Sequence, residues 1–392
     1  MTITYCKNIH DLAFKDHYLK PNFSRILLDK LTAQQFETGL QDTYFVYQYD
    51  LLKQILKHPN FTSRQIGYGN YKKLIALYPF SEIELKGDVL FSDFEQHCKL
   101  RSILLKSYRQ MFTHVPVLIK EVIAEHFYNE QKLCIGYGIS TPISEKIFLA
   151  LAGIGKINEY AQYQKFFTSI RVILNAIDNN FEDCSKNALV EHWKYLFALV
   201  IAKIKNPNTS YPNLIYGLNE TAEISIEEKA IMVLAFTRAG IENPRSFIVS
   251  AIIRLFQYPR LYKENKRMFM DEIMRYDCPA KITARHVSED TKIGEHIFKK
   301  DKKIWLSFRT ANFDNSVFEQ PFEFQLRKTN PYLSLGVGAH YCMGKELTFN
   351  LSIAILDYII SKNYHLEQQL DDYKLDDSPV FRRYVEPIFI TR

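Results

Sequence analysis

The stretch from Tyr332 to Leu347 limits the possible folds of this chain most strongly, because it joins a glycine-rich turn to a cysteine and then to a helix. Gly336 and Gly338 are separated by one residue and suit a tight turn close to a flat ligand, since glycine tolerates positive φ and carries no Cβ. Cys342 follows this turn, and the apolar residues of Leu347–Ile359 recur with helical spacing. A helix N-terminus and its amides favour a thiolate. The stretch therefore predicts a presented sulfur suited to binding a metal.

Bulk properties narrow the class of protein. A chain of 392 residues with 47% hydrophobic residues can bury a large core, as one domain or two. Its 50 Lys+Arg against 44 Asp+Glu give a net charge of +6, too mild for a nucleic-acid protein but suited to steering an acidic partner. Unpaired cysteine spacing argues against disulfides or zinc and fits a reducing cytoplasm. A charged N-terminus and short apolar runs predict neither signal peptide nor membrane span.

Apolar periodicity and turn residues predict a mainly helical chain with short strands. The expected helices are 50–57, one beginning at Asp93, 143–151, 159–177, 189–204, 226–255 and one carrying 271–275. The expected strands are 43–47, 281–285, short ones around 293 and 297, and 304–306. A long aromatic connection through Tyr68, Tyr71, Tyr78 and Phe80 is a candidate binding segment or a packed surface.

Two charged pairs occur at helical spacing. His97 and Arg101 lie one turn apart on one face, where they could hold carboxylates or form a solvated surface pair. Glu272 and Arg275 are neighbours at i,i+3 and could form a buried fork if a third partner balanced the charge.

The cysteine loop resembles that of the heme-thiolate monooxygenases, the cytochrome P450 family, which reads Phe-Gly-x-Gly-x-His-x-Cys-x-Gly. Every position matches except the first, which is Leu335. The alternative is a buried, inert cysteine. The resemblance covers nearly the whole chain and is strongest from Ile226 onward. It implies a single domain over residues 1–392, mainly α with small β-sheets (α+β), in a triangular helical P450-like fold with heme between the long distal helix and the cysteine-ligand loop.

The resemblance also implies roles for particular residues. Cys342 would be the axial ligand of the iron of heme b, and the structural fork beneath the heme would be Glu272, Arg275 and Arg327. Other expected cofactor contacts are His97, Arg101, Arg285, Leu335, Gly336, His340, Gly344 and Ala239. Leu335 lacks the aromatic ring that shields the sulfur in relatives, which predicts a shifted reduction potential.

The stretch Ala235–Pro244 resembles the oxygen-side helix of the family, Ala-Gly-x-(Asp/Glu)-Thr. Small residues at Ala235, Ala239 and Gly240 share one face and leave room for a flat ligand, while Pro244 deprives the Gly240 carbonyl of its helical donor. The expected catalytic residues are Glu242, Asn243 and Gly240. Asn243 replaces the threonine of the family, and an amide is a poor proton relay.

Arg238 on the same stretch needs an acidic partner if it is buried. The partner is either a carboxylate or phosphate of the substrate, or Glu242 at i,i+4. By resemblance the substrate pocket includes Arg238, Ala235, Lys281, Ile282, Thr283 and Val380, together with the 377–381 turn.

These features predict an oxidoreductase that activates dioxygen to hydroxylate, couple or cyclise an organic substrate of specialised metabolism, acidic or carrier-bound. Electrons would come from NAD(P)H through ferredoxin and ferredoxin reductase to a cytoplasmic monomer, docked at Lys99, Lys106, Arg109, Lys328 and Lys345. Asn243 leaves open a peroxide-dependent peroxygenase or a heme-thiolate isomerase or dehydratase. A third possibility is a non-catalytic heme sensor.

Overall fold

The computed structural model describes residues 43–63, 87–128, 130–155, 160–178, 186–208, 210–367, 375, 378, 380–385 and 387–392. The chain divides into two compact units. The first comprises Met1–Thr62, Glu130–Ser140 and Asn243–Arg392, and the second Ser63–Asn129 and Thr141–Glu242. The expected single domain over 1–392 stays a prediction. The N-terminal segment, the aromatic connection, Asp377 and Pro379 lie outside the described residues.

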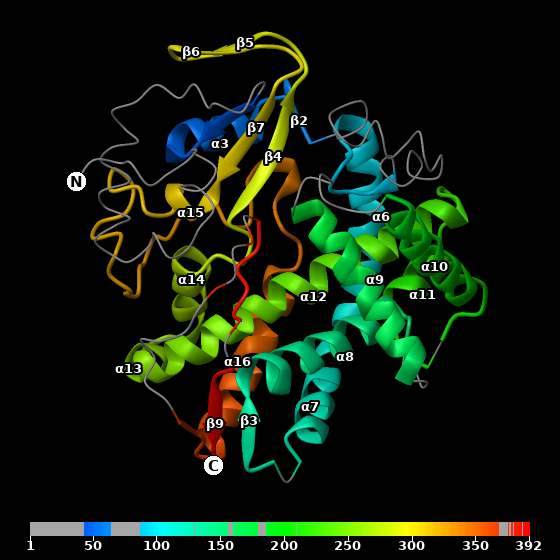
Figure 1. Ribbon diagram of the computed structural model, residues 1–392, viewed down its shortest axis with the longest axis vertical. Helices are drawn as coiled ribbons and strands as arrows, with labels where there is room; N and C mark the ends of the chain where they lie inside the picture. Colours follow the sequence, from blue (N-terminus) through cyan, green and yellow to red (C-terminus); the bar gives the residue numbers. More distant parts are fainter. Residues whose placement is uncertain are drawn as a thin grey trace. The chain divides into compact units, whose positions relative to one another are not determined.

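The first unit contains a four-stranded sheet in the order β1-β7-β4-β2 (Figure 1). Its strands are β1 (Thr43–Val46), β7 (Lys303–Ser307), β4 (Ile282–Val287) and β2 (Phe61–Thr62). β1 is parallel to β7, and the other pairs are antiparallel. β5 (Thr291–Ile293) and β6 (His296–Phe298) form a hairpin, and β3 (Lys132–Cys134), β9 (Phe389–Thr391) and β8 (His365–Leu366) form a third sheet.

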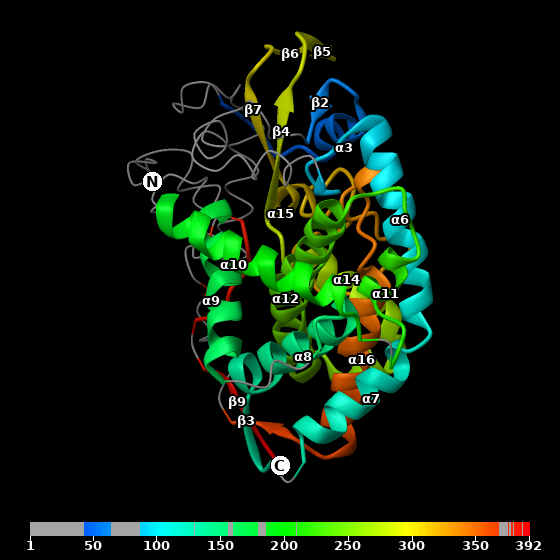
Figure 2. The same ribbon diagram turned by 90° about the vertical axis from the view of Figure 1, so that its right-hand side faces the viewer.

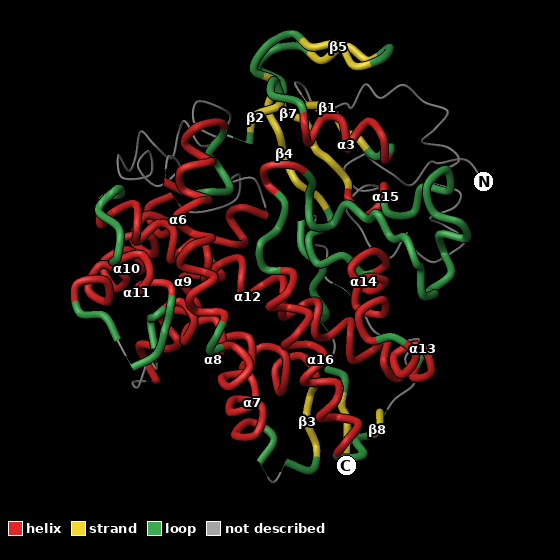
Figure 3. Tube along the Cα trace, turned by 180° about the vertical axis from the view of Figure 1, so that it is seen from behind, coloured by secondary structure: helices red, strands yellow, loops and turns green. Residues whose placement is uncertain are grey.

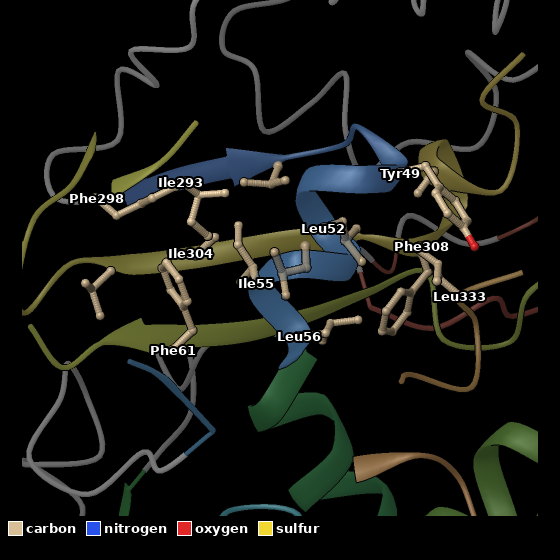
Figure 4. Packing of buried hydrophobic residues seen from close by; sticks show 14 of the residues in the cluster. Tyr49, Leu52, Ile55, Leu56, Phe61, Ile293, Phe298, Ile304, Phe308 and Leu333 are labelled. Carbon is tan, nitrogen blue, oxygen red and sulfur yellow. The ribbon is translucent and has the colours of Figure 1, made fainter. Parts of the chain in front are cut away.

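Helix α3 (Tyr49–Lys57) packs on this sheet. Leu52, Ile55 and Leu56 recur at i, i+3 and i+4 and bury one face of the helix against Ile304 (Figure 4). The same cluster includes Leu333, at the start of the cysteine loop. The sheet core therefore fixes one end of the loop.

The described part of the first unit holds further helices besides α3 and the C-terminal part of α12 (Ile226–Gln257). They are the π-helix η2 (Ile135–Ser140), α13 (Pro259–Glu264), α14 (Lys266–Tyr276), α15 (Phe308–Ala311), the 3₁₀ turn η3 (Gly338–His340) and α16 (Lys345–Ser361). Asn265 caps α14, because its side chain accepts a hydrogen bond from the Met268 N–H. The predicted helix after the cysteine is α16.

The second unit is helical (Figure 3). Its elements are α6 (Phe94–Phe112), α7 (Val115–His126), α8 (Thr141–Ala152), α9 (Tyr160–Asp178), α10 (Lys186–Lys205), α11 (Leu214–Asn219) and the first part of α12 (Ile226–Gln257). α9 packs against α10, as Figure 2 shows, and α6 packs against α11. α12 continues through Pro244. In the part of the chain that the structure describes, no helix is both long and apolar enough to cross a membrane.

Candidate active site

The cysteine loop presents its sulfur at the head of α16. Gly336 and Gly338 have φ values of 69° and 73°, as their turn requires. The Cys342 N–H donates to the Leu335 carbonyl at 2.8 Å, which closes the loop. The Gly344 N–H points at the Cys342 sulfur, 3.3 Å away, and Cys342 is exposed. The exposed, amide-supported sulfur differs from the buried, inert cysteine that was the alternative.

Asn312 fixes the segment that leads into this loop. Its Oδ1 accepts the Leu333 N–H at 2.8 Å, and its Nδ2 donates to the Arg275 carbonyl at 3.1 Å and to the Ser334 hydroxyl at 2.6 Å. The Ser334 hydroxyl in turn donates to the Met274 carbonyl at 2.6 Å. Asn312 is completely buried, and this network ties the loop to the end of α14. Sequence reasoning missed both Asn312 and Ser334.

The predicted fork is present: Glu272 and Arg275 lie on α14, and Arg327 reaches them from a later segment. Arg275 donates to Glu272 through Nε at 2.9 Å and Nη2 at 2.6 Å, and both side chains are fully buried. Arg327 Nε lies 3.3 Å from the Glu272 carboxylate. Arg275 Nη1 also donates to the Asn312 and Pro321 carbonyls. Glu272 compensates the charge of the fully buried Arg275, and the network joins α14 to the segment before the cysteine loop.

Lys281, the residue before β4, and Val380, in the C-terminal segment, are predicted pocket residues that contact each other. The Lys281 N–H donates to the Val380 carbonyl at 2.7 Å, and the Lys281 side chain is only 1% exposed. Ile282 is buried and Thr283 half-buried. Arg285, also buried, donates to the Ala284 carbonyl at 2.8 Å. His340, in η3, is half-buried.

A second buried ion pair joins the C-terminal end of α12 to the residue after α14. Arg254 donates to Asp277 through Nε at 2.6 Å and Nη2 at 2.9 Å, and Arg382 lies 3.5 Å from the same carboxylate. Burial alone would raise the pKa of Asp277, but the charges of Arg254 and Arg382 hold it below its usual value. This pair was not predicted.

In the second unit, His97 is buried at 2% exposure, which rules out a solvated surface pair. Its Nδ1 lies 2.9 Å from the Val89 carbonyl oxygen. A carbonyl oxygen can only accept, so Nδ1 carries the hydrogen of this bond. Arg101, one turn further along α6, is half-buried.

Arg238 meets a partner that the sequence did not indicate. Its Nη2 lies 2.5 Å from Asp88 Oδ2, and both side chains are buried. The guanidinium carbon also lies 5.3 Å from the centre of the Trp193 ring on α10. Burial raises the pKa of Asp88, and the Arg238 charge and the Leu90 N–H oppose that rise. The expectation that something acidic meets Arg238 holds, but the ion pair seen is neither of the two considered.

Gly240 was expected to leave room for a flat ligand, and the structure corrects this. A Cβ built on Gly240 would lie 1.9 Å from Cδ1 of Phe148, so the ring of α8 occupies that space. Ala239 is exposed and Ala235 half-buried. Glu242 is buried at 3% exposure. The Asn243 Oδ1 atom is buried and has no hydrogen-bond partner among the described residues.

The donor set suits a heme. An exposed sulfur that receives an amide N–H is the soft ligand that heme iron takes in thiolate proteins. Gly336 keeps the loop backbone compact, since a Cβ there would lie 3.3 Å from the His340 carbonyl oxygen. Arg285 and His97, two of the predicted cofactor contacts, are both buried, and they belong to different units.

Comparisons with known proteins agree with this donor set. The cytochrome P450 family model matches residues 266–377. The chain is 22% identical over 342 residues to the putative cytochrome P450 YjiB of Bacillus subtilis (strain 168), covering 82% of each chain. It is 23% identical over 271 residues to the biotin biosynthesis cytochrome P450 of the same organism, covering 66% of this chain and 68% of that protein. The solved structure of P450BioI in complex with hexadec-9Z-enoic acid ligated acyl carrier protein is similar at 22% identity and a TM-score of 0.76, covering 95% of this chain and 100% of that one.

The fold and the cysteine loop define a heme-thiolate oxidoreductase of the monooxygenase type, with the expected mainly helical fold and small sheets. The family model that matches residues 266–377, the similar relatives and the similar solved structures are all cytochrome P450s. Proteins of this family bind heme iron and receive electrons from NAD(P)H through redox partners.

Proposed function

We propose that this chain activates dioxygen to oxidise an acyl substrate carried on a protein, by hydroxylation, coupling or cyclisation, in specialised metabolism. The observation that carries the chemistry is the exposed Cys342 sulfur with the Gly344 N–H 3.3 Å away. A bound heme supplies dioxygen activation, because the thiolate ligand increases electron density at the iron and favours O–O cleavage.

The chain's own residues would hold the cofactor. Cys342 would bind the iron, and His97, Arg101, Arg285 and His340 would bind the propionates through charge-assisted hydrogen bonds. His97 and Arg285 are buried, so their bonds to a carboxylate would be little screened by solvent. Their side chains would thereby set the orientation of the ring.

The oxygen side would depend on Glu242 and Asn243. Glu242 is a buried acid that can give and take a proton. The Asn243 Oδ1 atom can accept a hydrogen bond from water, and so can the Gly240 carbonyl, which Pro244 deprives of its helical donor. A threonine hydroxyl both accepts and donates at one atom, whereas the amide oxygen only accepts. Proton delivery would therefore depend more on Glu242 here.

Two observations, on Arg238 and on a similar protein, support the proposed substrate class. Asp88 already balances the Arg238 charge, which weakens the case for a free acidic substrate held by Arg238. The similar P450BioI was solved with an acylated carrier protein, which supports a carried acyl chain for this protein. The formal net charge of +6 would attract an acidic carrier protein.

A titration of the heme-loaded protein tests this proposal. We expect an acyl carrier protein bearing hexadecenoate to shift the heme absorption band by displacing the iron-bound water, and unloaded carrier protein to leave it unchanged. Turnover with NAD(P)H, ferredoxin and ferredoxin reductase should then consume dioxygen and yield an oxidised acyl chain. Equal shifts with free hexadecenoate would refute the requirement for a carrier. No shift and no product with any acyl form would refute the substrate class.

A basic stripe on α6 would receive the ferredoxin. Lys99, Lys106 and Arg109 recur at i, i+7 and i+10, and all three are exposed. Lys345 is less suited, because its Nζ lies 2.8 Å from Asp271. We expect reduction to slow steeply with added salt. Lys106→Glu should weaken the salt dependence, and the exposed Lys292→Glu on β5 is the control. Salt-independent reduction would rule the stripe out.

Asn243 favours a second candidate, a peroxygenase or isomerase. An amide on the oxygen side disfavours proton delivery from solvent, which peroxide use or redox-neutral rearrangement would not require. Turnover with hydrogen peroxide alone, or under nitrogen, would support this candidate. Asn243→Thr should then raise the share of NAD(P)H that ends in product. An unchanged share would remove the argument from Asn243.

A further inference from the structure

The Arg238–Asp88 ion pair is built into a turn rather than isolated. The Asp88 Oδ1 atom accepts the Leu90 N–H at 2.8 Å, while Oδ2 accepts Arg238. The Phe91 N–H donates to the Asp88 carbonyl at 3.0 Å, which closes a turn over residues 88–91. The ion pair thus holds the first residue of a hydrogen-bonded turn against α12.

The turn directs one carbonyl at His97. Val89 is the second residue of the turn, and its carbonyl oxygen lies 2.9 Å from His97 Nδ1. Since the Leu90 and Phe91 N–H groups both donate to Asp88, these two bonds fix the peptides that follow Asp88 and hence the direction of the Val89 carbonyl. The hydrogen on Nδ1 and the plane of the ring are set accordingly, which leaves Nε2 as the ring nitrogen that this bond does not use.

We propose that Arg238, acting through Asp88 and the Val89 carbonyl, is the positioning residue that orients His97 toward a heme propionate. The proposal rests on the heme-anchoring role of His97 under the proposed function. Arg238 stands 150 residues from Asp88 in the sequence, so helix α12 is coupled to the anchor at the start of α6. Trp193 of α10 contacts the same guanidinium, so α10 shares this connection.

A buried ion pair on the same helix supplies a matched control. Arg254 also lies on α12 and pairs with a different buried aspartate, Asp277, which lies outside the turn at residues 88–91. Arg238→Gln and Arg254→Gln therefore make the same chemical change in similar surroundings. The double variant Arg238→Gln with Asp88→Asn avoids a lone buried charge if the single variant folds poorly.

The first measurement is the rate of heme transfer from the holoprotein to excess apomyoglobin. Arg238→Gln should raise this rate about tenfold, the size of one weakened charge-assisted hydrogen bond. Arg254→Gln should leave it within about twofold. In a His97→Phe background, Arg238→Gln should add nothing further. The same tenfold increase in that background would overturn the proposal, because Arg238 would then act without His97.

The second measurement reads the imidazole itself. In protein labelled with ¹⁵N-histidine, in the ferrous carbon-monoxide form, His97 is assigned by its loss in His97→Phe. Its Nδ1–H signal should disappear or exchange faster in Arg238→Gln and persist in Arg254→Gln. Persistence in both would overturn the proposal. If His97→Phe does not change heme transfer, the anchoring role fails, and this signal alone decides whether Arg238 orients His97.

Discussion

Gly240 offers a direct test of packing against catalysis. In Gly240→Ala, the new Cβ would lie 1.9, 2.4 and 2.5 Å from Cδ1, Cε1 and Cγ of Phe148, which is itself 3% exposed. Overpacking of a core costs about 1–3 kcal/mol, and contacts this short lie at the upper end. Replacing glycine by alanine in a helix returns about 1 kcal/mol. We therefore expect a net loss of about 1–2 kcal/mol of unfolding free energy.

The Phe148 atoms that clash with the new Cβ indicate which second substitution should restore the stability of Gly240→Ala. Phe148→Ala removes Cγ and everything beyond it, so Gly240→Ala should stabilise that background by about 1 kcal/mol. Phe148→Leu keeps a Cγ, 2.5 Å from the new Cβ if the backbone is unmoved, and should rescue much less. Urea unfolding followed by far-UV circular dichroism measures the effect of Gly240→Ala in all three backgrounds: wild type, Phe148→Ala and Phe148→Leu. If Gly240→Ala costs the same with and without the Phe148 ring, the packing argument is refuted. Loss of turnover at unchanged stability would return Gly240 to a catalytic role.

Three further predictions follow from single sites. Glu272→Gln should cost about 3–5 kcal/mol in urea unfolding, because Arg275 would stay charged at 0% exposure, while Lys266→Gln in a surface pair should cost under about 1 kcal/mol; similar losses would contradict this. Burial, then the charges of Lys303 and Arg285, lower the pKa of His286 to about 3, so between about pH 6.5 and 3 the unfolded chain binds a proton that the folded chain does not. The free energy of unfolding should therefore decrease as the pH is lowered through this range, by up to about 1.4 kcal/mol per pH unit. His286→Gln should reduce this slope. Leu335→Phe should move the heme midpoint in a redox titration, because the ring would shield the Cys342 side of the loop, and an unmoved midpoint would argue against it.

The cysteine loop and the Glu272–Arg275 pair could be predicted because the residues of each lie within a short segment of the sequence. Two positive-φ glycines, a cysteine and the head of α16 occupy ten residues, and backbone geometry alone fixes their arrangement. Glu272 and Arg275 meet because α14 brings i and i+3 together. The predicted helices 143–151, 159–177 and 189–204 likewise correspond to α8, α9 and α10. α8 and α10 are slightly longer than predicted, and α9 is shifted by one residue.

Other features depend on contacts between distant segments. The small residue at Gly240 suggested space for a ligand, but only the packing of α8 on α12 shows that Phe148 occupies it. The charge of Arg238 required an acid, yet any of many acids could have satisfied the sequence. No role was predicted for Asn312, although its three hydrogen bonds tie the cysteine loop to α14.

The sequence by itself determined the local arrangement around Cys342, because the cysteine, the glycine turn and the helix are neighbours along the chain. Only the tertiary structure decided which charges are already balanced. Asp88 pairs with Arg238, which is 150 residues away in the sequence. Arg254 on α12 pairs with Asp277, which follows α14. Local spacing encodes backbone geometry, whereas the partner of a buried charge is chosen by which segments the fold packs together.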